Sequence, residues 1–148
     1  MVFVNYFKAL NYLDLGLYVD ARVESRRMTI RLHELNDKYK EKKNRYSDDA
    51  FAHIMIGLIY DAGNDPNNAF IAYRNALETY QDIYQKNFGL SAPLQLKKDL
   101  LRTARQMGFN QELREYEDQF GMRYEPIKTD GGQLVMIWQN GFGPIKQE

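Results

Sequence analysis

Apolar side chains recur every three or four residues along most of this chain, which is the period of one face of an α-helix. One such stripe joins Tyr18, Ala21, Met28 and Leu32, and a second runs over residues 69–83. Turn-forming residues separate the stripes from one another. The pattern predicts six helices, near residues 2–15, 17–42, 48–62, 66–87, 92–107 and 110–120.

Glycines and capping residues mark the expected helix ends. A left-handed residue commonly closes a helix, and glycine adopts that conformation at little cost. Asp65 followed by Pro66 is typical of an N-cap and a first helical residue, and Ser47 followed by two aspartates indicates another start. Five glycines follow helical stripes: Gly16, Gly63, Gly89, Gly108 and Gly121.

The C-terminal part departs from this helical pattern. Residues 133–139 read Gln-Leu-Val-Met-Ile-Trp-Gln, a β-prone run bounded on both sides by glycine-containing turns. The run is apolar on both faces, and the rest of the chain offers no obvious strand to pair with it. We therefore expect a helical domain over residues 1–122 and a tail over 123–148 that contains one short β-strand.

The predicted helices repeat in pairs. Residues of the first pair recur 48 positions later, and those of the second pair recur another 44 positions later. Small residues recur where two helices would cross, which is typical of stacked helical repeats. The matched sets are Ala9, Tyr12, Ala21 and Met28; Gly57, Tyr60, Ala69 and Ala76; and Leu101, Ala104, Leu113 and Phe120.

These spacings resemble the tetratricopeptide repeat (TPR). The middle repeat differs from the family pattern at His53, where tryptophan is favoured, and at Gln81, where proline is favoured. Both periods exceed the ~34 residues of the family, so we expect the second helix of each of the first two pairs, with the loop after it, to be extended. The resemblance implies an all-α solenoid of antiparallel helical hairpins. The middle repeat carries the signature positions Ile56, Gly57, Tyr60, Ala69, Tyr73 and Ala76.

Four segments narrow the resemblance further. Residues 9–16, 21–24, 99–108 and 140–148 are similar to a family of bacterial envelope lipoproteins built on TPR-like repeats. Members of that family carry a lipidated N-terminal cysteine and continue past a tail like this one. The resemblance implies a location in the bacterial cell envelope, either periplasmic or membrane-anchored. The chain contains no cysteine, so membrane anchoring would depend on an N-terminal lipid anchor that is missing from it.

Charge and hydropathy exclude some classes of partner. Twenty basic residues balance twenty acidic ones, whereas a nucleic-acid-binding protein usually has a basic excess. Residues 22–45 hold nine basic and four acidic side chains, but these are interspersed, and Glu34 and Lys38 have the spacing of a helix-surface pair. No apolar run approaches the ~20 residues of a membrane span. We expect no nucleic-acid partner and no membrane span in this chain.

No motif indicates catalysis or a metal site. His33-Glu34 lacks the second histidine of a zinc motif four residues on, and His53 falls at a packing position typical of a core histidine. Residues 61–68 contain calcium-loop residue types, but the alternation is wrong and there is no glutamate at the twelfth position. The absence of cysteine removes thiolate chemistry. We expect no catalytic residues, no metal and no cofactor, and so a protein that is not an enzyme.

The resemblance places the first helix of each pair on a concave face. The groove would be apolar at one end and basic at the other, which suits a peptide with apolar anchors and an acidic end. The alternative is that the chain's own tail, or another domain, fills the apolar end. The lining positions transferred from the family are Phe3, Tyr6, Phe7 and Leu10; Phe51, Ile54, Met55 and Leu58; and Lys98, Arg102 and Arg105.

The sequence therefore predicts a non-enzymatic scaffold that binds a protein or peptide partner in the bacterial envelope. A second hypothesis is a structural or assembly component that forms a homo-oligomer through the apolar run Leu134–Trp138. A wall-active hydrolase is a third class, which the lack of a recognisable acid–base pair disfavours.

Overall fold

Helices make up almost all of the described chain in the computed structural model, which describes residues 2–38, 48–126 and 134–137. The six predicted helices are confirmed, within three residues wherever both ends are described. Residues 39–42, the expected end of the second helix, lie outside the described part. The helices are α1 (Val2–Asp14), α2 (Tyr18–Lys38), α3 (Ala50–Ala62), α4 (Pro66–Thr79), α6 (Leu94–Met107) and α7 (Asn110–Phe120).

The predicted helix over 66–87 is continuous but not uniform. α4 passes through a π-helical turn at Tyr80–Tyr84 into the short α5 (Gln85–Phe88). Three aromatic rings follow one another along this extension, with centroid distances of 5.0 Å between Tyr80 and Tyr84 and 5.8 Å between Tyr84 and Phe88. α2 is also long, at 21 residues. Both lengths match the expectation that the second helix of each early pair is extended.

Side-chain caps begin the two central helices. Asp65 accepts a hydrogen bond from the backbone N–H of Asn68 at 3.2 Å, and Pro66 occupies the first turn of α4, as the sequence predicted. Asp49 caps α3 by accepting from the N–H groups of Phe51 at 3.0 Å and Ala52 at 3.2 Å. α3 therefore starts two residues later than predicted, and Ser47 lies outside the described residues.

Four of the five predicted glycine C-caps are left-handed, with φ between 62° and 71°. The prediction for Gly63 was wrong, since its φ is −81°. Asn64 adopts the left-handed conformation instead, with φ 55°, and asparagine tolerates this region better than most residues. Gly63 is nevertheless tightly placed, because an added Cβ would lie 3.2 Å from Cδ of Arg22.

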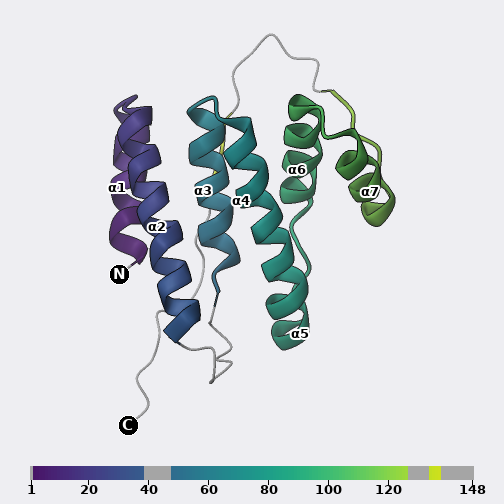
Figure 1. Ribbon diagram of the computed structural model, residues 1–148, viewed down its shortest axis with the longest axis horizontal. Helices are drawn as coiled ribbons and strands as arrows, with labels where there is room; N and C mark the ends of the chain where they lie inside the picture. Colours follow the sequence, from purple (N-terminus) through teal and green to yellow (C-terminus); the bar gives the residue numbers. More distant parts are fainter. Residues whose placement is uncertain (1, 39–47, 127–133, 138–148) are drawn as a thin grey trace.

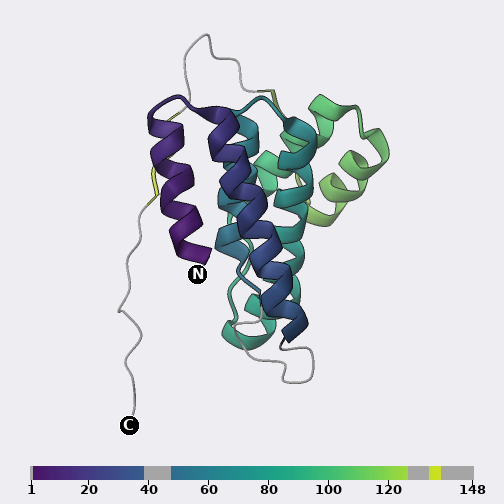
Figure 2. The ribbon, with the colours of Figure 1, turned by 60° about the vertical axis from the view of Figure 1, so that its left-hand side comes forward.

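Consecutive helices lie side by side in chain order, from α1 and α2 at one end to α6 and α7 at the other (Figures 1 and 2). α2 also packs on α3, and α4 packs on α6, so each pair is joined to the next. One large apolar cluster runs through these joints, from Tyr6 in α1 to Leu113 in α7. Small residues occupy the closest positions, and Ala21 and Ala69 are completely buried.

The closest approach is at Gly57, where α3 meets α4. A Cβ built at Gly57 would lie 2.3 Å from the ring of Tyr73, which is itself fully buried. The ring therefore fills the space that any other side chain at position 57 would need. This agrees with the small residue that the repeat pattern expects here.

The predicted strand is not formed in the described part of the tail. Residues 134–137 belong to no strand or helix, and Gln133, Trp138 and Gln139 lie outside the described residues. A strand requires a partner strand for its backbone hydrogen bonds. None of the described residues forms a strand with which residues 134–137 could pair.

Gly57→Ala should therefore destabilise the protein, although alanine is the better helix former. The intrinsic gain of about 1 kcal/mol is opposed by overpacking against a buried ring, which typically costs about 1–3 kcal/mol. Ala69→Leu, at a fully buried position of α4, should cost about as much. The free energies of unfolding of both variants in urea are the measurement, with Glu112→Ala on the exposed side of α7 as control. A Gly57→Ala protein more stable than the parent would contradict the tight crossing.

Candidate functional site

The residues of α1 and α3 that the sequence assigned to an apolar groove divide into core and surface residues. Tyr6 is 4% exposed and Met55 is 1% exposed, so both belong to the core and offer almost no surface to a partner. Phe7, by contrast, is 55% exposed. The side chain of Phe3 lies outside the described residues. The others are half-buried against the core: Leu10, Phe51, Ile54 and Leu58.

Aromatic rings join α1 to α3 at this apolar end. The ring centroid of Tyr6 lies 4.9 Å from that of Phe7 and 5.9 Å from that of Phe51. Tilted and edge-on arrangements at these distances are the favourable ones for aromatic pairs. Tyr6, Phe7 and Phe51 thus lie together, and Phe7 is the one of the three with the most exposed surface.

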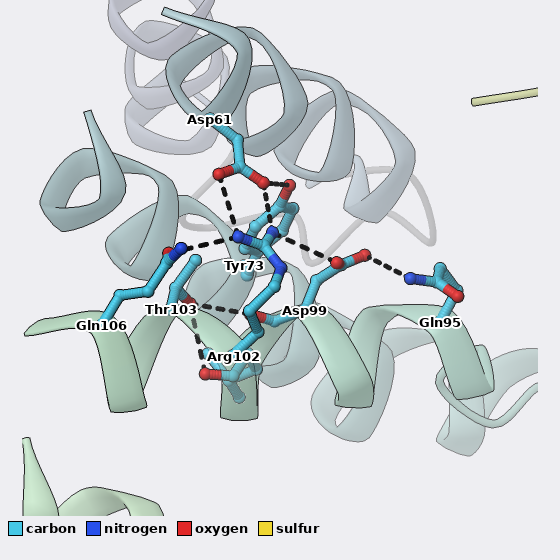
Figure 3. Close-up of polar contacts among 8 residues, drawn as sticks. Asp61, Tyr73, Gln95, Asp99, Arg102, Thr103 and Gln106 are labelled. Carbon is cyan, nitrogen blue, oxygen red and sulfur yellow. Dashed lines mark hydrogen bonds and ion pairs between the residues drawn. The ribbon is translucent and has the colours of Figure 1, made fainter. Parts of the chain in front are cut away.

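The predicted basic end is built around a partly buried ion-pair cluster (Figure 3). Arg102 of α6 donates to both carboxylate oxygens of Asp61 in α3, at 3.1 Å for Oδ1 and in a very short contact for Oδ2. It also donates to Asp99 Oδ1 at 3.2 Å and to Gln106 at 3.2 Å. The side chains of Arg102, Asp61 and Asp99 are 17%, 22% and 9% exposed. The cluster thus links α3 to α6 in a largely dehydrated place.

Neighbouring groups complete the cluster. The hydroxyl of Tyr73 in α4 donates to Asp61 Oδ2 at 3.4 Å, and the side-chain amide of Gln95 donates to Asp99 Oδ2 at 3.0 Å. Figure 3 shows Asp61 and Asp99 on the guanidinium of Arg102, with Tyr73 bonded to Asp61 and Gln95 bonded to Asp99. Every oxygen of the two carboxylates therefore accepts at least one hydrogen bond.

Burial and charge act in opposite directions on the pKa values of this cluster. Burial lowers the pKa of Arg102. Its hydrogen bond to Asp61 and the two carboxylate charges outweigh this effect and raise the pKa overall, so the guanidinium stays charged. Burial raises the pKa of Asp99, against the hydrogen bond from Gln95 and the charge of Arg102. Burial and then the charge of Asp61 raise the pKa of Tyr73 far above its ordinary value. Tyr73 therefore stays a neutral donor.

Arg102 consequently differs from the other two predicted basic residues. Both terminal nitrogens of its guanidinium already donate within the chain, and removing Arg102 would leave two carboxylates short of a counter-charge. Lys98 and Arg105 are exposed and make no ion pair or hydrogen bond within the described residues. The charges available to a partner are therefore Lys98 and Arg105, one turn of α6 to either side of Arg102.

A cleft of about 650 Å³ opens beside the cluster. One wall is α6, through Gln95, Lys98, Asp99, Leu101 and Arg102, and the other is the segment Met122–Pro126 that follows α7. A second hollow of about 340 Å³ includes Arg105 and shares Tyr124 and Pro126 with the first. Each free cation thus lies at its own depression along one side of α6.

Three members of this site escaped the sequence analysis, namely Asp61, Asp99 and the wall 122–126. Asp61 and Arg102 lie 41 residues apart, so no local spacing reveals the pair. One signal was available. Asp61 falls in the last turn of α3, at the negative end of the helix dipole, where a carboxylate requires a cation.

A second polar cluster lies between α2 and α4 at the start of α3. His53 is 6% exposed, which confirms the core histidine expected from the sequence. Its Nε2 lies 3.0 Å from Asp48 Oδ1, and Thr79 donates to Asp48 Oδ2 at 2.8 Å. Burial opposes ionisation of Asp48, but the hydrogen bonds from His53, Thr79 and the Asp49 N–H lower its pKa overall. Asp48 therefore joins the start of α3 to the end of α4.

No group of three or more His, Asp or Glu side chains among the described residues could hold a metal ion. No described helix is both long and apolar enough to cross a membrane.

Comparisons with known proteins give no relative. No protein-family model, curated protein or solved structure matches the chain.

Arg102→Met should destabilise the protein by about 3–5 kcal/mol, because it leaves Asp61 and Asp99 with little compensation in a dehydrated place. Arg105→Met, one turn further along the same helix, should stay within about 0.5 kcal/mol of the parent. Adding Asp61→Asn and Asp99→Asn to Arg102→Met should restore part of the loss. Urea unfolding measures all three, and equal stabilities for the two arginine variants would rule out the structural role.

Asp48→Asn should lower stability by about 1–3 kcal/mol near neutral pH, since it weakens hydrogen bonds to a charged acceptor. The pKa of Asp48 is lower in the folded state than in the unfolded state. Its contribution is therefore present above about pH 4 and is lost as the pH falls through the folded pKa. Thermal unfolding of both proteins between pH 2.5 and 7 should show their difference shrinking below about pH 4. A constant difference over that range would contradict this role.

Proposed function

We propose that this chain is a TPR-like helical-repeat scaffold of the bacterial envelope that binds a protein or peptide partner. The observation that carries the proposal is a pair of exposed cations on α6 that form no ion pair or hydrogen bond within the described residues. Lys98 and Arg105 lie beside open hollows, whereas Arg102 between them is held by Asp61 and Asp99. Surface charges left free beside a hollow suit recognition of an acidic partner.

The geometry narrows the partner's chemistry. Residues seven apart on a helix are separated by about 10 Å along the axis and lie on nearly the same side. A partner that engages both Lys98 and Arg105 must therefore carry two acidic groups at about that spacing. The exposed ring of Phe7 and the half-buried residues of α3 would take apolar side chains at the other end of the same segment. Both features fit an extended or helical peptide.

Two observations support a binding role. The elongated second helices and the small residues at the crossings agree with the resemblance to stacked repeats. The two polar clusters around Arg102 and Asp48 link helices through hydrogen bonds within the chain, as structural clusters do. Self-association through Leu134–Trp138 stays as the second candidate, because Leu134 is 85% exposed and Met136 80% exposed.

Charge reversal at both free cations should weaken partner capture. Lys98→Glu with Arg105→Glu is expected to reduce recovery from a solubilised envelope fraction by roughly five- to thirtyfold, equivalent to about 1–2 kcal/mol. The effect should diminish at high salt, because exposed charges are screened. Arg26→Glu, an exposed reversal on α2, is the matched control. Recovery that is equal for parent, variant and control at both salt concentrations would refute the proposal.

A further inference from the structure

The segment that follows α7 turns back towards the helices it came from. Met122 donates its backbone N–H to Glu117 O at 3.1 Å, and Tyr124 donates its N–H to Glu117 Oε1 at 2.8 Å. The guanidinium of Arg123 donates to Glu117 Oε2 at 2.8 Å. Met122 and Tyr124 also pack against the main apolar cluster. Residues 122–126 are therefore fixed in place as one wall of the cleft beside α6.

The same segment reappears at the opposite end of the helical row. In Figure 1, residues 134–137 pass behind α3, on the side away from α2 and α4. In Figure 2, they run alongside α1. The two views together place the backbone of these four residues on the side of the helical row that α1 and α3 form. Phe7, Phe51 and Ile54 of the apolar end belong to the same two helices.

Exposure alternates along these four residues. Leu134 and Met136 are 85% and 80% exposed, whereas Val135 and Ile137 are 50% and 38% exposed. Successive side chains of an extended chain point to opposite sides. Val135 and Ile137 therefore lie on the less exposed side of the segment, and Leu134 and Met136 lie on the more exposed side.

We propose that residues 134–137 act as an intramolecular ligand of the α1/α3 end, which a partner must displace. This inference rests on the proposed function and specifies it. The site would accept an extended chain with branched aliphatic side chains two residues apart, as in Val135 and Ile137. The tether holds the segment at a high effective concentration, in the millimolar range for short linkers. A competing partner must therefore bind substantially better than the segment itself.

Two full-length variants test the contact without altering the helical core. Val135→Asp with Ile137→Asp changes the less exposed side, and Leu134→Asp with Met136→Asp changes the more exposed side. Both add the same charge, and the apolar clusters contain none of these residues. The probe is a fluorescent peptide of residues 131–140. It should bind Val135→Asp/Ile137→Asp at least about tenfold more tightly than the parent or the Leu134→Asp/Met136→Asp control, because only that variant vacates the site.

Equal binding to all three proteins, or binding to none, overturns the proposal. Sedimentation of the parent chain adds a second check, since a dimer that dissociates on Val135→Asp/Ile137→Asp would mean that a neighbouring copy supplies the segment. Failure here is distinguishable from failure of the binding role, which the Lys98 and Arg105 variants measure independently. If the peptide does not bind but partner capture stays salt-dependent, the inference about residues 134–137 fails and the proposed binding role still stands.

Discussion

The arrangement of the three helix pairs depends on how closely α3 approaches α4 at Gly57. The absence of a side chain there admits the ring of Tyr73, and the ring carries its hydroxyl to Asp61 at the end of α3. Asp61 lies at the negative end of a helix, so its charge is unfavourable there unless a cation compensates it. Arg102 supplies that cation from α6. A packing constraint in the second pair thus determines where the third pair attaches.

This chain of contacts separates fixed from available charge. Because Asp61 and Asp99 together outweigh the single charge of Arg102, the cluster is not a basic patch, although it lies at the basic end expected from the sequence. Lys98 and Arg105 are held at a set spacing by the same helix that Arg102 fixes. Rigid placement of a few unengaged groups lowers the entropy that a partner must lose on binding. In the proposed binding role, the ion pair would contribute to recognition by holding α6 in place, without touching the partner.

Periodicity predicted the helices well because the apolar spacing within a helix, such as residues 69–83, directly reflects which face of that helix is buried. Local capping was predictable for Asp65 and Pro66 for the same reason, since both act within one turn. The prediction for Gly63 was wrong because the next residue, Asn64, is also able to adopt the left-handed conformation. The pair of Asp61 and Arg102 was not predictable, since its spacing is set by helix packing. The family resemblance selected a helix face, but it did not distinguish the buried Tyr6 from the exposed Phe7.

The C-terminal segment has two attachments of different character. Residues 122–126 are held by hydrogen bonds to Glu117, whose pKa is lowered by the Tyr124 N–H and by Arg123. Residues 134–137 have only two side chains of lower exposure, Val135 and Ile137, at 50% and 38%. Hydrogen bonds fix the first attachment, whereas the proposed second attachment would rest on the partial burial of these two aliphatic side chains, so it would be the weaker one. A partner at α1 and α3 would therefore release the distal residues first and leave the cleft wall beside Lys98 intact. Occupancy of the apolar end and of the charged end can then change independently, although one continuous segment borders both.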